Sequence, residues 1–141
     1  LAEDELIATA LLHDTCEDCH ILPEELPVNA TVQEAVRRLS FFPEPGVEHS
    51  VARDRYFARI PGNRIAVLTK LLDRCNNLSY MVYGFSRDKL LDYIEETERA
   101  VMPLLTYAEK NYPHDANALF LLNYQMHSTM NSIRALLERN L

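Results

Sequence analysis

The helical periodicity of its apolar residues is the feature that most constrains this chain. From Asn63 to Tyr83 and from Pro113 to about Arg139, apolar side chains recur every three or four positions. This spacing places them on one face of an α-helix. The residues we expect to be buried are Ile65, Leu68, Leu71, Leu72, Cys75 and Leu78 in the first segment, and Leu119, Leu122, Met126, Met130, Ile133, Leu136 and Leu137 in the second.

Four more segments are predicted to be helical. The first runs from Leu1 to about Cys19. The second begins with a capping box at Thr31, and this helix ends near Leu39. The third covers Val47 to Arg59. The fourth follows a Ser86 cap, runs from Arg87 to about Lys110 and contains Pro103, which should bend or interrupt it.

The composition agrees with an all-α fold. Only 3 glycines occur in 141 residues, and no segment predicts a strand. Gly84 stands where a C-terminal helix cap belongs. The length suits one domain, residues 1–141, so we expect a helical bundle of about five to seven helices. The chain begins with Leu1 in what reads as mid-helix, and we expect further N-terminal helices upstream.

Charge and cysteine content limit the functional classes. A net charge of −7 argues against a broad nucleic-acid surface. No apolar run approaches the length of a transmembrane helix, so we expect no membrane association. Three cysteines are too few for a disulfide framework, and an odd number cannot all pair with one another. We therefore expect a cytoplasmic protein. A homo-oligomer is compatible with the sequence.

The stretch from His13 to Asp18 concentrates an imidazole and three carboxylates beside apolar residues. In one continuous helix, His13, Asp14, Glu17 and Asp18 would share an arc of roughly 140°. The simple interpretation is a solvated face, and the alternative is a functional site. The string Cys16-Glu17-Asp18-Cys19-His20 also matches the c-type haem pattern. We disfavour haem because of the two acids and the missing export signal, and zinc because no second ligand pair follows.

A second stretch, from Lys70 to Asn77, lies in the helix that is otherwise committed to the core. Asp73 there needs an explanation, since a buried carboxylate must be paired or bound to a metal. Arg74 is a candidate partner in a purely structural account. The functional alternative combines His13, Asp14 and Asp73, a ligand set suited to manganese, iron or magnesium.

Taken together, His13-Asp14-x-x-Glu17-Asp18 and Lys70-x-x-Asp73-Arg74-x-x-Asn77 resemble the HD-domain hydrolases. More narrowly, they resemble the hydrolase domain of the RelA/SpoT homologues, which remove the 3′-pyrophosphate of (p)ppGpp. The segment from Lys89 to Leu105 is similar to the family helix that follows the Asp-Arg motif. The resemblance implies an HD-domain bundle and a metal-dependent phosphohydrolase with a nucleotide substrate.

The resemblance also implies residue roles. His13, Asp14 and Asp73 would bind the metal, typically Mn²⁺. Glu17 and Asp18 would position or deprotonate the attacking water. Asn77 would contact the nucleotide, and Lys70 and Arg74 would either contact it or brace the carboxylates.

The chain departs from the family pattern in three ways. A further histidine ligand and a basic pocket segment would both precede Leu1, and Asn76 stands where the family has histidine. Two alternatives therefore stay open. One is an HD phosphohydrolase for another nucleotide or phosphoester, and the other is a helical regulatory module with a vestigial site.

The segment from Val47 to Arg59 is unusually basic. Arg53, Arg55 and Arg59 recur along it. They form either a solvated helix face or a local positive wall for a phosphorylated substrate, and the sequence leaves both interpretations open.

Overall fold

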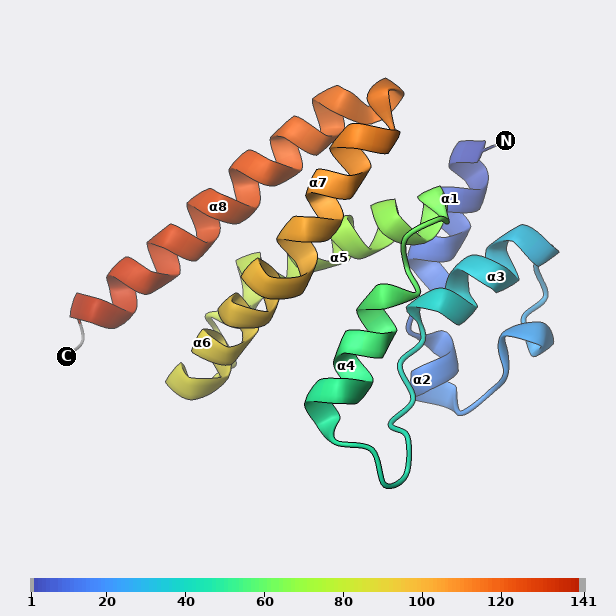
Figure 1. Cartoon of the computed structure of the whole chain (residues 1–141), viewed down its shortest axis with the longest axis horizontal. Coiled ribbons are helices and arrows are strands. Elements are labelled where there is room, and N and C mark those ends of the chain that lie inside the picture. The colour runs from blue at the N-terminus through green and yellow to red at the C-terminus, as the bar shows by residue number, and fades with distance from the viewer. Residues whose placement is uncertain (1, 140–141) are drawn as a thin grey trace. The chain divides into compact units, whose positions relative to one another are not determined.

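The computed structural model describes residues 2–139, and these fold only into helices and their connections (Figure 1). Helix accounts for 79% of the residues, which confirms the all-α prediction. With α6 and α7 taken as one interrupted helix, six long helices are present in the described part, within the predicted range. The α-helices are α1 (Ala2–Leu12), α2 (Thr15–Cys19), α3 (Ala30–Leu39), α4 (His49–Ala58), α5 (Arg64–Met81), α6 (Arg87–Glu96), α7 (Met102–Asn111) and α8 (Ala116–Arg139).

The backbone divides into two compact units, Leu1–Lys70 and Leu71–Leu141. In the first unit α1 packs against α3, as Figure 1 shows in blue and cyan. Their shared core contains the buried residues Cys16, Leu26, Val32 and Val36. A 3-10 turn at Pro23–Glu25 leads into α3.

The first predicted helix is wrong in one respect. The helix stops at Leu12, and α2 starts at Thr15 after a turn at His13 and Asp14. The Asp14 carbonyl accepts the Asp18 amide at 3.0 Å and so begins α2. The four polar residues therefore do not share one continuous helical arc.

The start of α3 also differs from the prediction. Asn29, not Thr31, is the N-cap, and its side-chain oxygen accepts the Val32 amide at 3.0 Å. The Asn29 amide donates to Glu5 at 3.0 Å, which ties the cap to α1. Asn satisfies the unpaired amides of a helix start as well as Thr does.

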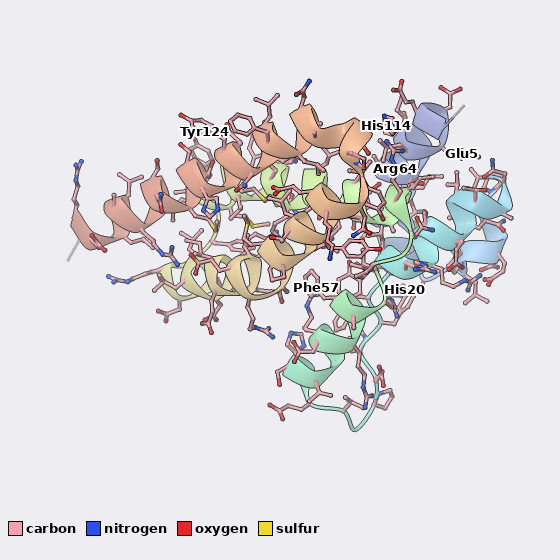
Figure 2. The ribbon with its side chains drawn as sticks, turned by 45° about the horizontal axis from the view of Figure 1, so that its top comes forward. Glu5, His20, Phe57, Arg64, His114 and Tyr124 are labelled. Atoms are coloured by element: carbon pink, nitrogen blue, oxygen red, sulfur yellow. The ribbon has the colours of Figure 1, made fainter. Side chains whose placement is uncertain are left out.

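In the second unit α7 packs against α8, shown in orange and red in Figure 1. Leu119, Met126, Met130 and Ile133 are buried along α8 as predicted. Leu136 is 50% exposed, which contradicts the predicted stripe near the end of the helix. The opposite side of α8 is exposed, and Figure 2 labels Tyr124 there.

Pro103 interrupts the helix from Arg87 as predicted. A π-helical segment, Thr97–Val101, joins α6 to α7, and Pro103 lies in the first turn of α7. Proline lacks an amide hydrogen and cannot make the regular i to i−4 bond, so the widened turn comes just before it. The Ser86 cap is confirmed, because its hydroxyl accepts the Lys89 amide.

Helix α5 confirms part of its predicted core. Leu71 and Leu78 are buried, whereas Leu72 is 45% exposed. The predicted Gly84 cap is wrong: α5 ends at Met81, and Gly84 has no positive φ. No helix within residues 2–139 is both long and apolar enough to cross a membrane.

Candidate functional site

The turn between α1 and α2 places the two predicted ligands of the first unit side by side. His13 Nε2 lies 3.3 Å from Asp14 Oδ1. The His13 side chain is 16% exposed and that of Asp14 is 62% exposed. The break in the helix thus turns one ligand inward and leaves the other facing solvent.

The His13 ring is oriented by the backbone. Its Nδ1 lies 2.7 Å from the Ala10 carbonyl oxygen, which can only accept, so Nδ1 carries the hydrogen. In the neutral ring Nε2 then has its lone pair directed toward the Asp14 carboxylate. Two electron-rich atoms at this separation require a proton or a cation. Histidines that bind metals commonly donate their other ring nitrogen to a carbonyl in this way.

Glu17 and Asp18 occupy different environments on α2. Glu17 is partly buried, and its Oε1 accepts the backbone amide of Phe41, in the loop after α3. Asp18 is exposed. The two predicted water-handling residues therefore differ, because one carboxylate already anchors a loop and the other faces solvent.

The two cysteines of the Cys16-x-x-Cys19 string also face different ways. Cys16 is fully buried in the core of the first unit, and Cys19 is exposed. Burial raises the pKa of the Cys16 thiol, which disfavours the reactive thiolate. This division gives a physical reason to set aside the haem and zinc interpretations.

In the second unit, Asp73 is partly buried on α5. Its Oδ1 accepts a hydrogen bond from the Asn77 amide, one turn later, at 3.1 Å. Burial raises the pKa of the neighbouring Tyr93, and a hydrogen bond with Asn77 opposes that rise. The hydrogen bond from Asn77 thus fixes the position of the Asp73 carboxylate, which the family resemblance assigns to the metal.

Arg74 is 1% exposed and joins α5 to α6 and the π-helical segment. Its guanidinium donates to Glu96 at 2.6 Å and to Thr97 at 3.1 Å. It also lies 4.0 Å from the centroid of the Tyr93 ring. Of the two roles predicted for Arg74, bracing fits these contacts, and Glu96 is a carboxylate that it braces.

Lys70, the third predicted substrate-binding residue, belongs to the first unit. Its Nζ lies 5.4 Å from the Tyr56 ring centroid and 5.9 Å from that of Phe57. Both rings are buried, and Figure 2 shows Phe57 near the end of α4. The lysine is therefore held over an aromatic surface that sequence analysis did not include in the site.

Known proteins give no guide to this arrangement. No family model, no curated protein and no solved structure matches the chain. Within residues 2–139, no three His, Cys, Asp or Glu side chains gather closely enough to hold a metal ion. The structure brings His13 and Asp14 together in the first unit, and Asp73 belongs to the second. The complete ligand set stays a prediction.

Sequence analysis missed two groups of residues at these positions. One is the pair Glu96 and Tyr93. A carboxylate such as Glu96 could have been predicted, since a buried arginine on a core helix requires a carboxylate partner. The other is the aromatic set around Lys70. Only the basic character of residues 47–59 pointed toward it.

Proposed function

We propose that the chain is a metal-dependent phosphohydrolase that removes the 3′-pyrophosphate of (p)ppGpp. The observation that carries the proposal is the pairing of His13 Nε2 with Asp14 Oδ1 at 3.3 Å, with Nδ1 fixed on a backbone carbonyl. A neutral imidazole and a carboxylate are donors that suit Mn²⁺ and similar metals. The narrower substrate assignment rests on the resemblance of the two motifs.

In this proposal His13, Asp14 and Asp73 hold Mn²⁺ or another divalent metal. The metal would lower the pKa of water and offset charge on a phosphoryl oxygen. Asp73 is kept in position by a hydrogen bond from the Asn77 side-chain amide. In the proposal the same amide also contacts the nucleotide.

Glu17 and Asp18 divide the handling of water between them. Glu17 is oriented by the Phe41 amide, which binds one carboxylate oxygen and leaves the second oxygen for water. Asp18 is exposed and can accept a proton from water and pass it to solvent. Arg74 supports the site through Glu96, without contact to the nucleotide.

The proposal includes a cytoplasmic protein with a small nucleotide as its partner. All three cysteines, Cys16, Cys19 and Cys75, are free thiols, which suits a reducing compartment.

The test is release of pyrophosphate from ppGpp in the presence of Mn²⁺, by the chain together with any native residues that precede Leu1. Asp73→Ala and His13→Ala should each reduce kcat/KM on the order of a thousandfold or more. Both should also lower the bound manganese measured by elemental analysis. A chelator should abolish activity, and added Mn²⁺ should restore it.

Matched controls are Asp92→Ala, an exposed acid on α6, and His114→Ala, an exposed histidine before α8. Both should keep full activity and metal content. Release of phosphate or pyrophosphate from other substrates only would indicate a different HD phosphohydrolase. No release from any nucleotide and no bound metal would identify a non-catalytic helical module.

A further inference from the structure

The exposed side of α8 carries an apolar patch that the proposed mechanism does not use. Phe120 and Tyr124 are each 68% exposed there and Leu121 is 64% exposed, and Figure 2 labels Tyr124. Phe120 and Leu121 both lie within one helical turn of Tyr124, so the three side chains are neighbours. Isolated exposed apolar residues are ordinary on a protein surface, whereas a contiguous patch of large ones marks an interaction site.

This patch belongs to a longer exposed line of residues, which we call the outer α8 seam. Its members are separated by alternating steps of four and three residues, and all are exposed: Asn117, Leu121, Tyr124, Ser128, Asn131 and Ala135. A spacing that averages 3.5 residues keeps side chains in line toward one partner helix. The partner that covers the seam along its length is therefore a helix.

The seam lies in a part of α8 without charged side chains. Residues 116–133 contain no Asp, Glu, Lys or Arg, although these types make up 25% of the chain. Two copies of a chain with a net charge of −7 repel each other over most of their surfaces, and they can approach with least repulsion at an uncharged face. A strongly basic or acidic partner would find no complementary charge there. The charge pattern thus favours a second copy of the chain as the partner.

The two halves of the seam are complementary in shape. The N-terminal half carries the three large apolar side chains of the patch, whereas Ser128, Ser132 and Ala135 in the C-terminal half are small. A hollow of about 440 Å³ lies along this face, lined by residues from Phe120 to Asn131. A cavity of about 150 Å³ is enough to hold a benzene ring, so this hollow has room for an aromatic side chain of another molecule.

We propose that the outer α8 seam binds the same seam of a second copy of the chain, as an antiparallel helix pair. In this orientation the large half of each seam lies on the small half of the other. A two-fold axis makes each contact twice, as an interface between identical surfaces requires. A parallel pair would instead place large side chains against large ones and leave the small ones apart.

The size of the face indicates how tight the pair is. α8 has 24 residues, and a helix of that length is about 36 Å long. With two aromatic side chains that are 68% exposed, such a face offers on the order of 500 Å² for each copy. The pair would then bury about 1,000 Å² in total, the lower end for a specific interface, so we expect a reversible dimer with a Kd in the micromolar range.

The direct test is sedimentation equilibrium of the full chain from about 1 μM to about 1 mM. The unaltered chain should change from monomer to dimer over this range, and added salt should strengthen the dimer by screening the repulsion between two acidic copies. Tyr124→Glu brings two like charges into the interface and should weaken association roughly a hundredfold. An equal mixture of Tyr124→Glu and Tyr124→Lys should recover part of the association, because position 124 lies near the middle of the seam.

Tyr83→Glu is the matched control, since Tyr83 is 85% exposed in the turn after α5 and the change adds the same charge to the chain. It should change the Kd less than about twofold. Circular dichroism should show the same helix content for all variants. The inference is overturned if the unaltered chain stays monomeric throughout, or if Tyr83→Glu weakens the dimer as much as Tyr124→Glu does.

The orientation is tested by disulfide cross-linking under a mild oxidant. In a chain with Cys19→Ser and Cys75→Ser, the only native thiol left is Cys16, which is fully buried. Asn117→Cys and Ala135→Cys lie at opposite ends of the seam, so an antiparallel pair should cross-link only when the two variants are mixed. Cross-linking of each variant alone, without the mixed product, would overturn the antiparallel arrangement. None of these measurements depends on hydrolysis of a nucleotide, so this inference and the proposed function stand or fall separately.

Discussion

The segment from His13 to Asp18 and the segment from Lys70 to Asn77 carry similar side chains on different backbones. The first contains a turn that divides α1 from α2, whereas the second lies within the uninterrupted helix α5. In the first segment, the turn at His13 and Asp14 directs the polar side chains toward their partners. In the second, helical spacing alone brings Asn77 to Asp73, one turn apart.

The two segments also hold their charges differently. Asp14 in the first is 62% exposed, whereas Arg74 in the second is 1% exposed and bonded to Glu96. A charge facing water is stabilised by solvent and contributes little to folding. A buried charge depends on its partner, and loss of that partner is costly. Folding should therefore tolerate substitution of Asp14 but not of Arg74.

The largest expected effect on stability comes from Arg74→Met. This change removes the buried guanidinium that pairs with the largely buried Glu96 carboxylate, and it should cost about 3–5 kcal/mol of unfolding free energy. Urea denaturation followed by circular dichroism measures the loss.

Asp14→Ala is the comparison from the first segment, and it should change stability by less than about 0.5 kcal/mol. The double variant Arg74→Met with Glu96→Leu should recover most of the loss, since an apolar pair can replace a buried ion pair. Equal losses for Arg74→Met and Asp14→Ala would remove the contrast between the segments.

Within the first segment, Glu17→Ala should cost more than Asp18→Ala. Glu17 satisfies the Phe41 amide, and removing an acceptor from a partly buried amide costs about 1–2 kcal/mol. Asp18 is exposed and should cost less than about 0.5 kcal/mol. Amide hydrogen exchange at Phe41 should accelerate in Glu17→Ala alone. Similar exchange in both variants would mean that Glu17 does not anchor the loop.

Much of the fold was predictable because apolar periodicity reports which helix face is buried. The periodicity placed the helices of both units, and the proline at position 103 predicted the break near it. The periodicity did not reveal the turn at His13 and Asp14, where no glycine or proline marks a stop. It also predicted Leu72 and Leu136 as buried, because position on a helix face does not determine how far the packing partner extends.

The candidate site was predictable where partners are close in sequence. Asn77 and Asp73 are four residues apart, and their pairing follows from the helix. Glu17 and Phe41 are 24 residues apart and meet through a loop, so no local pattern connects them. The same holds for Arg74 and Glu96, 22 residues apart. Local rules therefore identified the chemical groups but not the contacts that orient them.

The smallest expected effect concerns a second Arg–Glu pair in the same unit. Arg134 donates to Glu98 at 2.6 and 2.7 Å, as close as Arg74 to Glu96, yet its side chains are 39% and 44% exposed. Solvent and salt screen such a pair, so Arg134→Ala should cost only about 0.5 kcal/mol and less at high salt.

The pH dependence of this exposed pair has a definite sign. Hydrogen bonding to Arg134 lowers the pKa of Glu98 below 4.5 in the folded chain. The contribution of the pair is thus complete above pH 4.5 and is lost as the pH falls through the lowered pKa of Glu98. Urea titrations at pH 7 and pH 3 should show a smaller difference between Arg134→Ala and the unaltered chain at the lower pH. If Arg134→Ala at pH 7 cost as much unfolding free energy as Arg74→Met, burial would not be what distinguishes strong from weak ion pairs in this unit.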